Sequence, residues 1–202
     1  MHHIPLIGPY KPDDILAWEQ DGPRTARQFL SDVTRLAELL PDRPTVLNLA
    51  TSRYEFLVGF AAAILRRQLT LLPQSRAPQT LRRIAGDYPD SYGLTDREET
   101  INGIESVLIQ LRGSLAPWPD EIPRVPLNQV VAIAFTSGST GQPMPNKKTW
   151  GALTAVAHAT GSRLGINGGN SGAVVATVPH QHMFGLEASV ILPIMQIGRA
   201  HV

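Results

Sequence analysis

The sequence predicts an α/β protein with mainly parallel sheets, because apolar strands and amphipathic helices alternate along it in units of about 20–25 residues. Two helix starts are marked by capping-box spacing, Thr25 with Gln28 and Ser52 with Glu55. The apolar run at 130–135, Val-Val-Ala-Ile-Ala-Phe, is typical of a strand that is buried on both faces. Together these features indicate βα units around a buried sheet.

The elements of the first half follow from apolar periodicity and its interruption by proline. Phe29, Leu30, Val33 and Leu36 share one face of the first helix, and Pro41 ends it. We predict helices at 25–40, 52–67 and 79–86, and strands at 45–50, 69–72 and 106–111.

Residues 112–128 differ from the sequence on either side, because they carry four prolines and little periodicity. We therefore expect a first βα region over about 1–112, a proline-rich connection over 113–128, and a second region over 129–202. In the second region we predict strands at 130–135 and 173–178, a helix at 150–163, and a helix at 184–196 with a kink at Pro193.

Composition narrows the class of protein. Hydrophobic residues make up 43% of the 202 and charged residues 17%, which is typical of a globular chain. A net charge of +1 argues against nucleic acid or an anionic membrane as the main partner. The lack of cysteine excludes disulfides, thiolate metal sites and a cysteine nucleophile. No apolar run approaches the ~20 residues of a membrane span and no signal-peptide pattern is present, so we expect a cytoplasmic protein without a span.

A loop rich in glycine and hydroxyl groups follows the buried strand. Glycines let a backbone approach a phosphate closely, and successive N–H groups and hydroxyls can donate to it, so this composition favours an anion-binding nest. Lys147 and Lys148 follow closely enough to add positive charge. An ordinary serine- and glycine-rich surface turn is the competing interpretation. The six residues of the loop are Thr136, Ser137, Gly138, Ser139, Thr140 and Gly141.

Two better-known motifs do not fit this loop. A Walker loop needs a Gly-Lys pair, and the sequence contains none. A nucleophile elbow needs Gly-x-Ser-x-Gly, but Ser137 stands two residues before Ser139, and Ala173 stands two residues after Ser171.

The octapeptide at 136–143, TSGSTGQP, resembles the phosphate-loop signature of the acyl-adenylating superfamily, which includes acyl- and aryl-CoA synthetases and peptide-synthetase adenylation domains. Downstream, residues 179–185, PHQHMFG, are similar to the Pro-x-x-His-x-x-Gly pattern of the same superfamily. The resemblance is strong over 130–185 and looser before that. Within the superfamily, Met144 and Pro145 with the downstream QHMFGLE look most similar to ligases of aryl-polyene and xanthomonadin-type pigment pathways.

The resemblance implies an ATP- and Mg²⁺-dependent ligase that activates an aryl or fatty carboxylic acid as acyl-AMP and transfers it to coenzyme A or an acyl carrier protein. The six loop residues and Lys147 would bind the β- and γ-phosphates. His182 would border the carboxylate pocket, and Gly185 would let the next helix pack closely. The catalytic groups would be Thr136, Ser139, Thr140 and Lys148.

The sequence departs from the superfamily pattern in two ways. Met144 and Pro145 stand where a Lys-Gly pair is usual, so Lys147 or Lys148 would have to supply the charge. The superfamily's magnesium-holding glutamate motif, ribose-binding aspartate and lysine-bearing C-terminal small domain have no counterpart in these 202 residues. We therefore expect the N-terminal part of an AMP-binding domain that does not complete adenylation alone. An inactive nucleotide-binding remnant or scaffold is the alternative.

His180 and His182 have the spacing of a possible metal pair, but no carboxylate or cysteine cluster accompanies them, so the sequence predicts no metal site. A pocket-wall role for His182 is the preferred interpretation.

Overall fold

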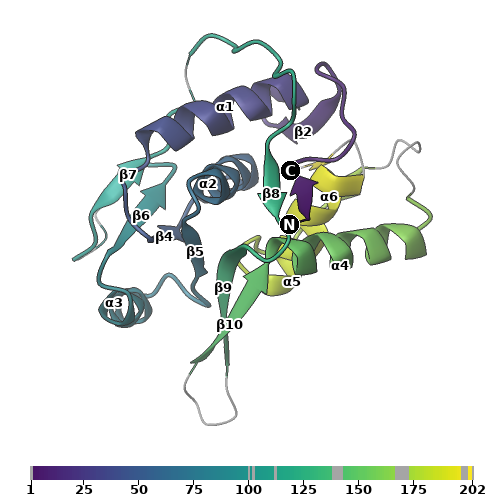
Figure 1. Cartoon of the computed structure of the whole chain (residues 1–202). Coiled ribbons are helices and arrows are strands. Elements are labelled where there is room, and N and C mark those ends of the chain that lie inside the picture. Colours follow the sequence, from purple (N-terminus) through teal and green to yellow (C-terminus); the bar gives the residue numbers. More distant parts are fainter. Residues whose placement is uncertain are drawn as a thin grey trace.

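The computed structural model describes residues 2–99, 101, 103–111, 113–137, 143–166, 173–196 and 200–201. It confirms the predicted α/β class, with helices packed around a mainly parallel sheet (Figure 1). Residues 138–142, the centre of the predicted phosphate loop, lie outside the described residues.

The central sheet has six strands in the order β10-β9-β5-β4-β6-β7. All neighbours pair in parallel except β9 and β10, which form an antiparallel hairpin at one edge. Because β9 lies beside β5, the two regions on either side of the proline-rich connection share one sheet. The strands are β4 (Thr45–Asn48), β5 (Leu69–Leu72), β6 (Ser91–Thr95), β7 (Ser106–Leu108), β9 (Val130–Ser137) and β10 (Pro143–Thr149).

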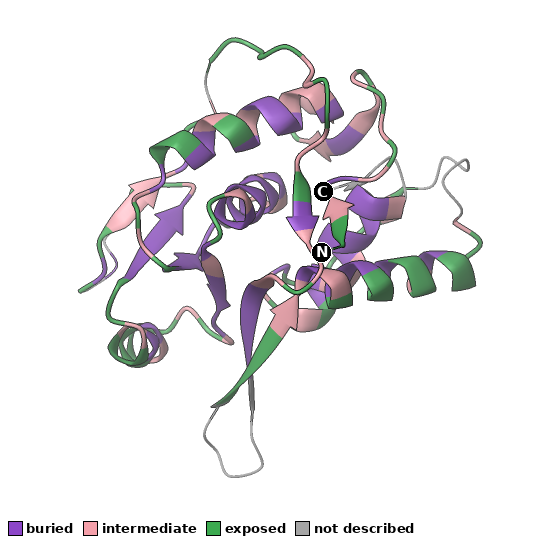
Figure 2. Cartoon of the chain, viewed as in Figure 1, coloured by how far each residue is buried: buried purple, intermediate pink, exposed green. Residues whose placement is uncertain are grey.

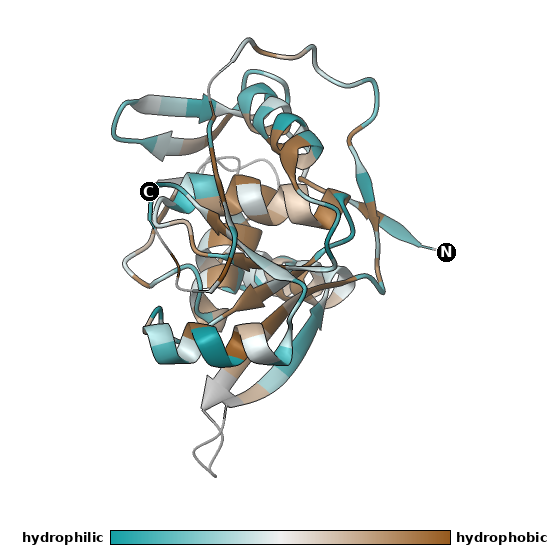
Figure 3. Cartoon of the chain, turned by 90° about the vertical axis from the view of Figure 1, so that its left-hand side faces the viewer, coloured by the Kyte–Doolittle hydropathy of each residue, from teal (hydrophilic) through white to brown (hydrophobic). Residues whose placement is uncertain are grey.

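Helices cover both faces of this sheet. On one face, α2 (Arg53–Leu65) is almost wholly buried under α1 (Ala26–Leu39), as Figure 2 shows. On the other face, Leu81 and Ile84 of α3 (Pro78–Asp87) pack in a smaller cluster with residues of β4, β5 and β9. Helix α4 (Trp150–Arg163) follows β10 and packs against the C-terminal helices. The central strands and α2 form the hydrophobic interior seen in Figure 3.

Two small sheets complete the fold. Strand β1 (His3–Pro5) pairs with β8 (Arg124–Pro126), which lies within the proline-rich connection. The second small sheet has the order β11-β12-β2-β3, made of β2 (Ile15–Glu19), β3 (Gly22–Thr25), β11 (Val174–Val175) and β12 (Ala200–His201). The sequence did not predict β1, β2, β3, β6, β8, β10 or β12.

Local signals located the helices well. The structure confirms the helix at 150–163, the strand at 69–72 and the Thr25 capping box, in which Gln28 Oε1 accepts from the Thr25 N–H at 2.8 Å. The strand expected at 173–178 is reduced to the two residues of β11.

The helix expected at 184–196 contains a π-helical turn. It begins as α5 (Met183–Leu186), widens into the π-helix at Glu187–Ile191, and continues as α6 (Leu192–Gln196). The Leu192 N–H donates to the Glu187 carbonyl, five residues back, directly before Pro193. The sequence predicted a kink at Pro193, whereas the structure shows a widened turn directly before this proline, which has no N–H to donate.

Within the described ranges, none of the helices has both the length and the apolar character that crossing a membrane requires.

Candidate phosphate- and carboxylate-binding site

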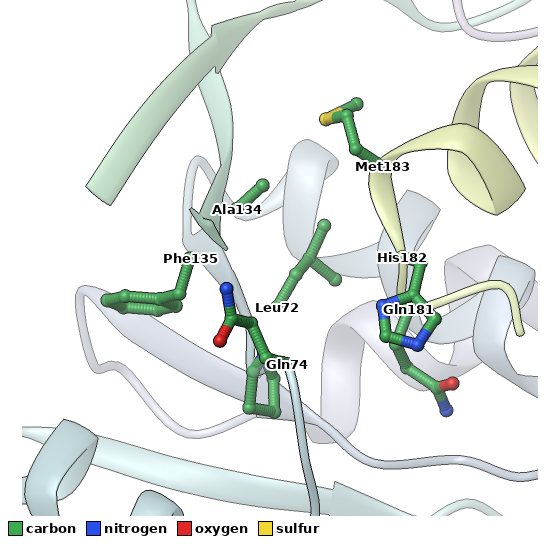
Figure 4. A pocket seen from close by; sticks show the side chains of 8 residues that line it. Leu72, Gln74, Ala134, Phe135, Gln181, His182 and Met183 are labelled. Atoms are coloured by element: carbon green, nitrogen blue, oxygen red, sulfur yellow. The ribbon is translucent and has the colours of Figure 1, made fainter. Parts of the chain in front are cut away.

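A cavity of about 340 Å³ opens at the carboxyl ends of β5 and β9 (Figure 4). This is the edge at which open α/β sheets bind ligands. Three chain segments line it. The resemblance to the acyl-adenylating superfamily predicted that two of them, the end of β9 and the segment around His182, belong to one site. The lining residues are Leu72, Pro73 and Gln74 after β5, Ala134 and Phe135 of β9, and Gln181, His182 and Met183.

The predicted phosphate loop begins at this cavity. Phe135 lines the cavity, and the next two residues, Thr136 and Ser137, end β9. The chain returns at Pro143, which pairs with Ser137 in the β9–β10 hairpin. The loop residues Gly138, Ser139, Thr140 and Gly141 lie outside the described residues.

The two candidate lysines lie on β10, along the hairpin and away from its tip. Lys147 pairs with Ile133 and Lys148 with Ala132, so the lysines are four and five residues beyond Pro143. A strand rises about 3.3 Å per residue, which puts Lys147 roughly 13 Å from Pro143. Opposite residues of an antiparallel pair share a face, so Lys148 lies on the face of Ala134 and Lys147 on that of Phe135.

His182 is exposed and lies at the cavity wall (Figure 4). It is the N-cap residue of α5, and its carbonyl accepts from the Leu186 N–H at 2.8 Å. The position of its imidazole therefore depends on how the segment before α5 is held.

The neighbouring His180 is buried and anchors that segment. Its Nε2 lies 2.9 Å from the carbonyl oxygen of Ala50, a residue just beyond the end of β4. Its ring packs against the Phe56 ring, with 4.5 Å between the two ring centroids. A carbonyl oxygen only accepts, so Nε2 carries the proton. Burial lowers the pKa of His180, which favours the neutral imidazole. The Gln181 side chain donates to the same carbonyl at 3.0 Å.

Gly185 permits a close approach between α5 and the segment that precedes it. A Cβ at this position would lie 2.0 Å from the Pro179 carbonyl oxygen and 2.8 Å from its carbon. Only glycine fits such a contact with backbone, and so Gly185 fixes the turn that presents His182.

The cavity lining combines apolar side chains with a few hydrogen-bonding groups. Its lining residues include the Gln74 amide and the His182 imidazole as hydrogen-bonding groups and no carboxylate, whereas the Gln181 amide already donates to the Ala50 carbonyl. Phosphate or carboxylate oxygens can accept from such groups, whereas Mg²⁺ prefers an oxygen-rich ligand set. In the described part of the chain, no three His, Cys, Asp or Glu side chains come together as a metal site. These donor groups are therefore compatible with an anionic ligand such as a phosphate or a carboxylate.

A cluster of carboxylates near the N-terminus of α2 was not predicted from the sequence. Asp96 Oδ2, after β6, accepts from the N–H groups of Thr51 and Ser52 at 2.6 Å each. Partial burial opposes ionisation of Asp96, but these hydrogen bonds lower its pKa overall. Burial, followed by the charges of Asp96 and Glu19, raises the pKa of Glu55 to about 7.

We expect Glu55 to make stability depend on pH. Its folded-state pKa of about 7 lies above its ordinary value of 4.5, so the free energy of unfolding should fall as pH rises through that window. Glu55→Gln should flatten this dependence, and the exposed Glu38→Gln is the matched control. Urea unfolding measured below, within and above the window checks the prediction. An unchanged profile in Glu55→Gln would contradict it.

No protein-family model and no curated protein sequence matches this chain. Solved structures do match it. A malonyl-CoA ligase, in a complex with methylmalonyl-CoA and AMP, has a TM-score of 0.79 at 19% identity, over 98% of this chain and 43% of that one. ATP-bound MatB from Rhodopseudomonas palustris has a TM-score of 0.76 at 16% identity, over 95% and 42%. The o-succinylbenzoate-CoA synthetase MenE from Bacillus subtilis, in complex with ATP and magnesium, has a TM-score of 0.75 at 18% identity, over 95% and 54%.

The fold is therefore that of the N-terminal domain of adenylate-forming enzymes. The chain spans about half the length of the structures it matches.

Proposed function

We propose that this chain is the phosphate-binding part of an ATP-dependent ligase that activates a carboxylic acid as acyl-AMP and passes it to a thiol. One observation carries the proposal. The hydroxyl-rich segment begins directly after Phe135, in the last two residues of β9, and His182 lines the same cavity as Phe135 at the carboxyl edge of the sheet. The matched ligases are about twice as long as this chain, so the proposal assigns these residues only part of the active site.

In this proposal the loop binds the β- and γ-phosphates of ATP through backbone N–H groups and hydroxyls. The carboxylate lies near His182 and attacks the α-phosphorus, and pyrophosphate leaves. The loop then acts by positioning and by stabilising the developing negative charge. Its donors are Thr136, Ser137, Gly138, Ser139, Thr140 and Gly141.

The acid and the acceptor are the finer part of the proposal. Met144 and Pro145, together with the QHMFGLE segment at 181–187, support an aryl or fatty acid of the aryl-polyene or xanthomonadin pigment type. Coenzyme A is the favoured acceptor because the matched enzymes are named as CoA ligases and synthetases. An acyl carrier protein is the other candidate acceptor. A cytoplasmic location, with access to ATP, belongs to the same proposal.

Acid-dependent exchange of pyrophosphate into ATP by the full-length protein tests the proposal over a panel of aryl and fatty acids. Exchange that requires one class of acid supports the ligase and identifies its substrate. Binding of ATP without exchange for any acid would overturn it in favour of an inactive nucleotide-binding remnant.

We also expect Lys147 or Lys148 to replace the charge that is missing at Met144. Because both lysines lie back along β10, this role requires the phosphates to lie along the hairpin rather than at its tip. Lys147→Ala and Lys148→Ala should differ, with one of them raising the apparent KM for ATP and leaving that for the acid unchanged. If neither variant changes the KM for ATP, the charge comes from elsewhere.

A further inference from the structure

Arg53 connects the start of α2 to the segment that carries His182. It is the first residue of α2, and its guanidinium reaches the chain on both sides of the cavity wall. Before His182 in the sequence (the entry side), Nη2 donates to the Val178 carbonyl at 2.9 Å and to the Ala176 carbonyl at 3.4 Å. After His182 in the sequence (the exit side), Nη1 donates to Ser189 Oγ.

The exit-side contact continues into α5. Ser189 Oγ donates to the Gly185 carbonyl oxygen at 2.5 Å, and Ser189 is buried within the π-helical turn. Gly185 in turn packs against the Pro179 carbonyl. The Arg53 guanidinium thus binds both ends of the 176–189 segment, the N-terminal end at Ala176 and Val178 and the C-terminal end at Ser189. His182 lies between these two ends.

Stability alone does not account for an arginine at this position. A cation at the first position of a helix opposes the macrodipole, which favours negative charge there. Burial also lowers the pKa of Arg53, and within the described residues its Nε is buried without a hydrogen-bond partner. Residues that break several local rules at once are characteristic of functional sites.

We propose that Arg53 is a positioning residue that fixes His182 at the cavity wall by clamping the 176–189 segment at both ends. The expected effect of Arg53 on carboxylate binding rests on the proposed ligase function. The contacts of Arg53 with the 176–189 segment do not depend on that function. Arg53 has no assigned contact with ATP or acid, and its effect on the reaction passes through the Val178 and Ser189 contacts.

Hydrogen exchange on the full-length protein tests the clamp without any assay of activity. In Arg53→Gln, amides of 180–191 should exchange faster while those of β4 and β5 keep their protection. Ser189→Ala removes only the exit-side contact, so its effect should be confined to 185–191. Arg66→Gln is the control, because Arg66 is an exposed residue just beyond the other end of α2 and pairs with Asp42. Unchanged exchange at 180–191, or a uniform increase throughout the chain, would overturn the proposal.

Kinetics of the full-length protein test the consequence for substrate. Arg53→Gln should raise the KM for the acid by at least about tenfold with little change in that for ATP, because small displacements of a pocket group are costly. The double variant with Ser189→Ala should add less than the sum of the two single effects, since both changes break one network. Faster exchange at 180–191 in a protein that shows no ligase activity would retain the clamp and reject the proposed function. Equal rises in both KM values would reject the specific role of Arg53.

Discussion

Replacing Thr136, Ser139 and Thr140 together with alanine should lower acid-dependent pyrophosphate exchange by about 10²-fold or more. Loss of a single well-placed donor to a developing negative charge costs on the order of 10²–10³ in rate. Three hydroxyls are lost here, although the backbone N–H groups of the loop remain. Exchange should be measured at saturating acid and ATP so that the loss is assigned to the chemical step.

The matched control for this variant removes hydroxyls elsewhere. Ser114 and Ser162 are exposed and lie outside the cavity lining, so their double replacement by alanine should leave exchange unchanged. The loop variant should also unfold at a urea concentration close to that of the unmodified protein. Activity of the loop variant within twofold of the unmodified protein would show that the loop is a surface turn.

Helices were predicted well because their signals are local. Helix α4 begins after Thr149, whose hydroxyl accepts from the Ala152 N–H at 3.2 Å, and this cap can be recognised within four residues of sequence. The same is true of Thr25 at α1 and Ser52 at α2. Capping and apolar periodicity together were enough to order the βα units.

The missed strands have physical reasons. Strand β10 contains Pro143 and Pro145, which weaken a sequence-based strand prediction, but it lies at a sheet edge where a strand tolerates proline. Strands β1 and β3 also contain proline, at Pro5 and Pro23. Strand β12 has only two residues, and it pairs with β2 from the other end of the chain.

Part of the site could be predicted and part could not. The spacing of His182 and Gly185 after Pro179 is a local pattern, and the structure places His182 at the cavity and Gly185 against Pro179. The sequence did not predict roles for Gln74 and Arg53, because long-range packing brings Gln74 to the cavity and Arg53 to the segment that carries His182. Arg53 and Ser189 are 136 residues apart, and no local pattern predicts such a pair.

Gly185→Ala should both destabilise the protein and impair its activity, because the added methyl group has no space. Its Cβ would lie 2.0 Å from the Pro179 carbonyl oxygen, a backbone atom that cannot turn aside as a flexible side chain can. Helix α5 must therefore move away from the segment before it, and His182, its N-cap residue, must move as well. Overpacking of this kind costs about 1–3 kcal/mol of stability. A displaced pocket group can lower the rate by about 10²-fold.

The matched control is Gly86→Ala in α3, where nothing lies within 4 Å of the added Cβ. Alanine is the better helix former, so this variant should gain about 0.4–1 kcal/mol of stability. Urea unfolding of the two variants, with pyrophosphate exchange measured under conditions where each remains folded, separates the stability effect from the catalytic one. Opposite changes in stability, with activity lost only in Gly185→Ala, are expected. A Gly185→Ala variant as stable and as active as the unmodified protein would show that the contact with Pro179 is not maintained in solution, and His182 would then need another means of being held at the cavity.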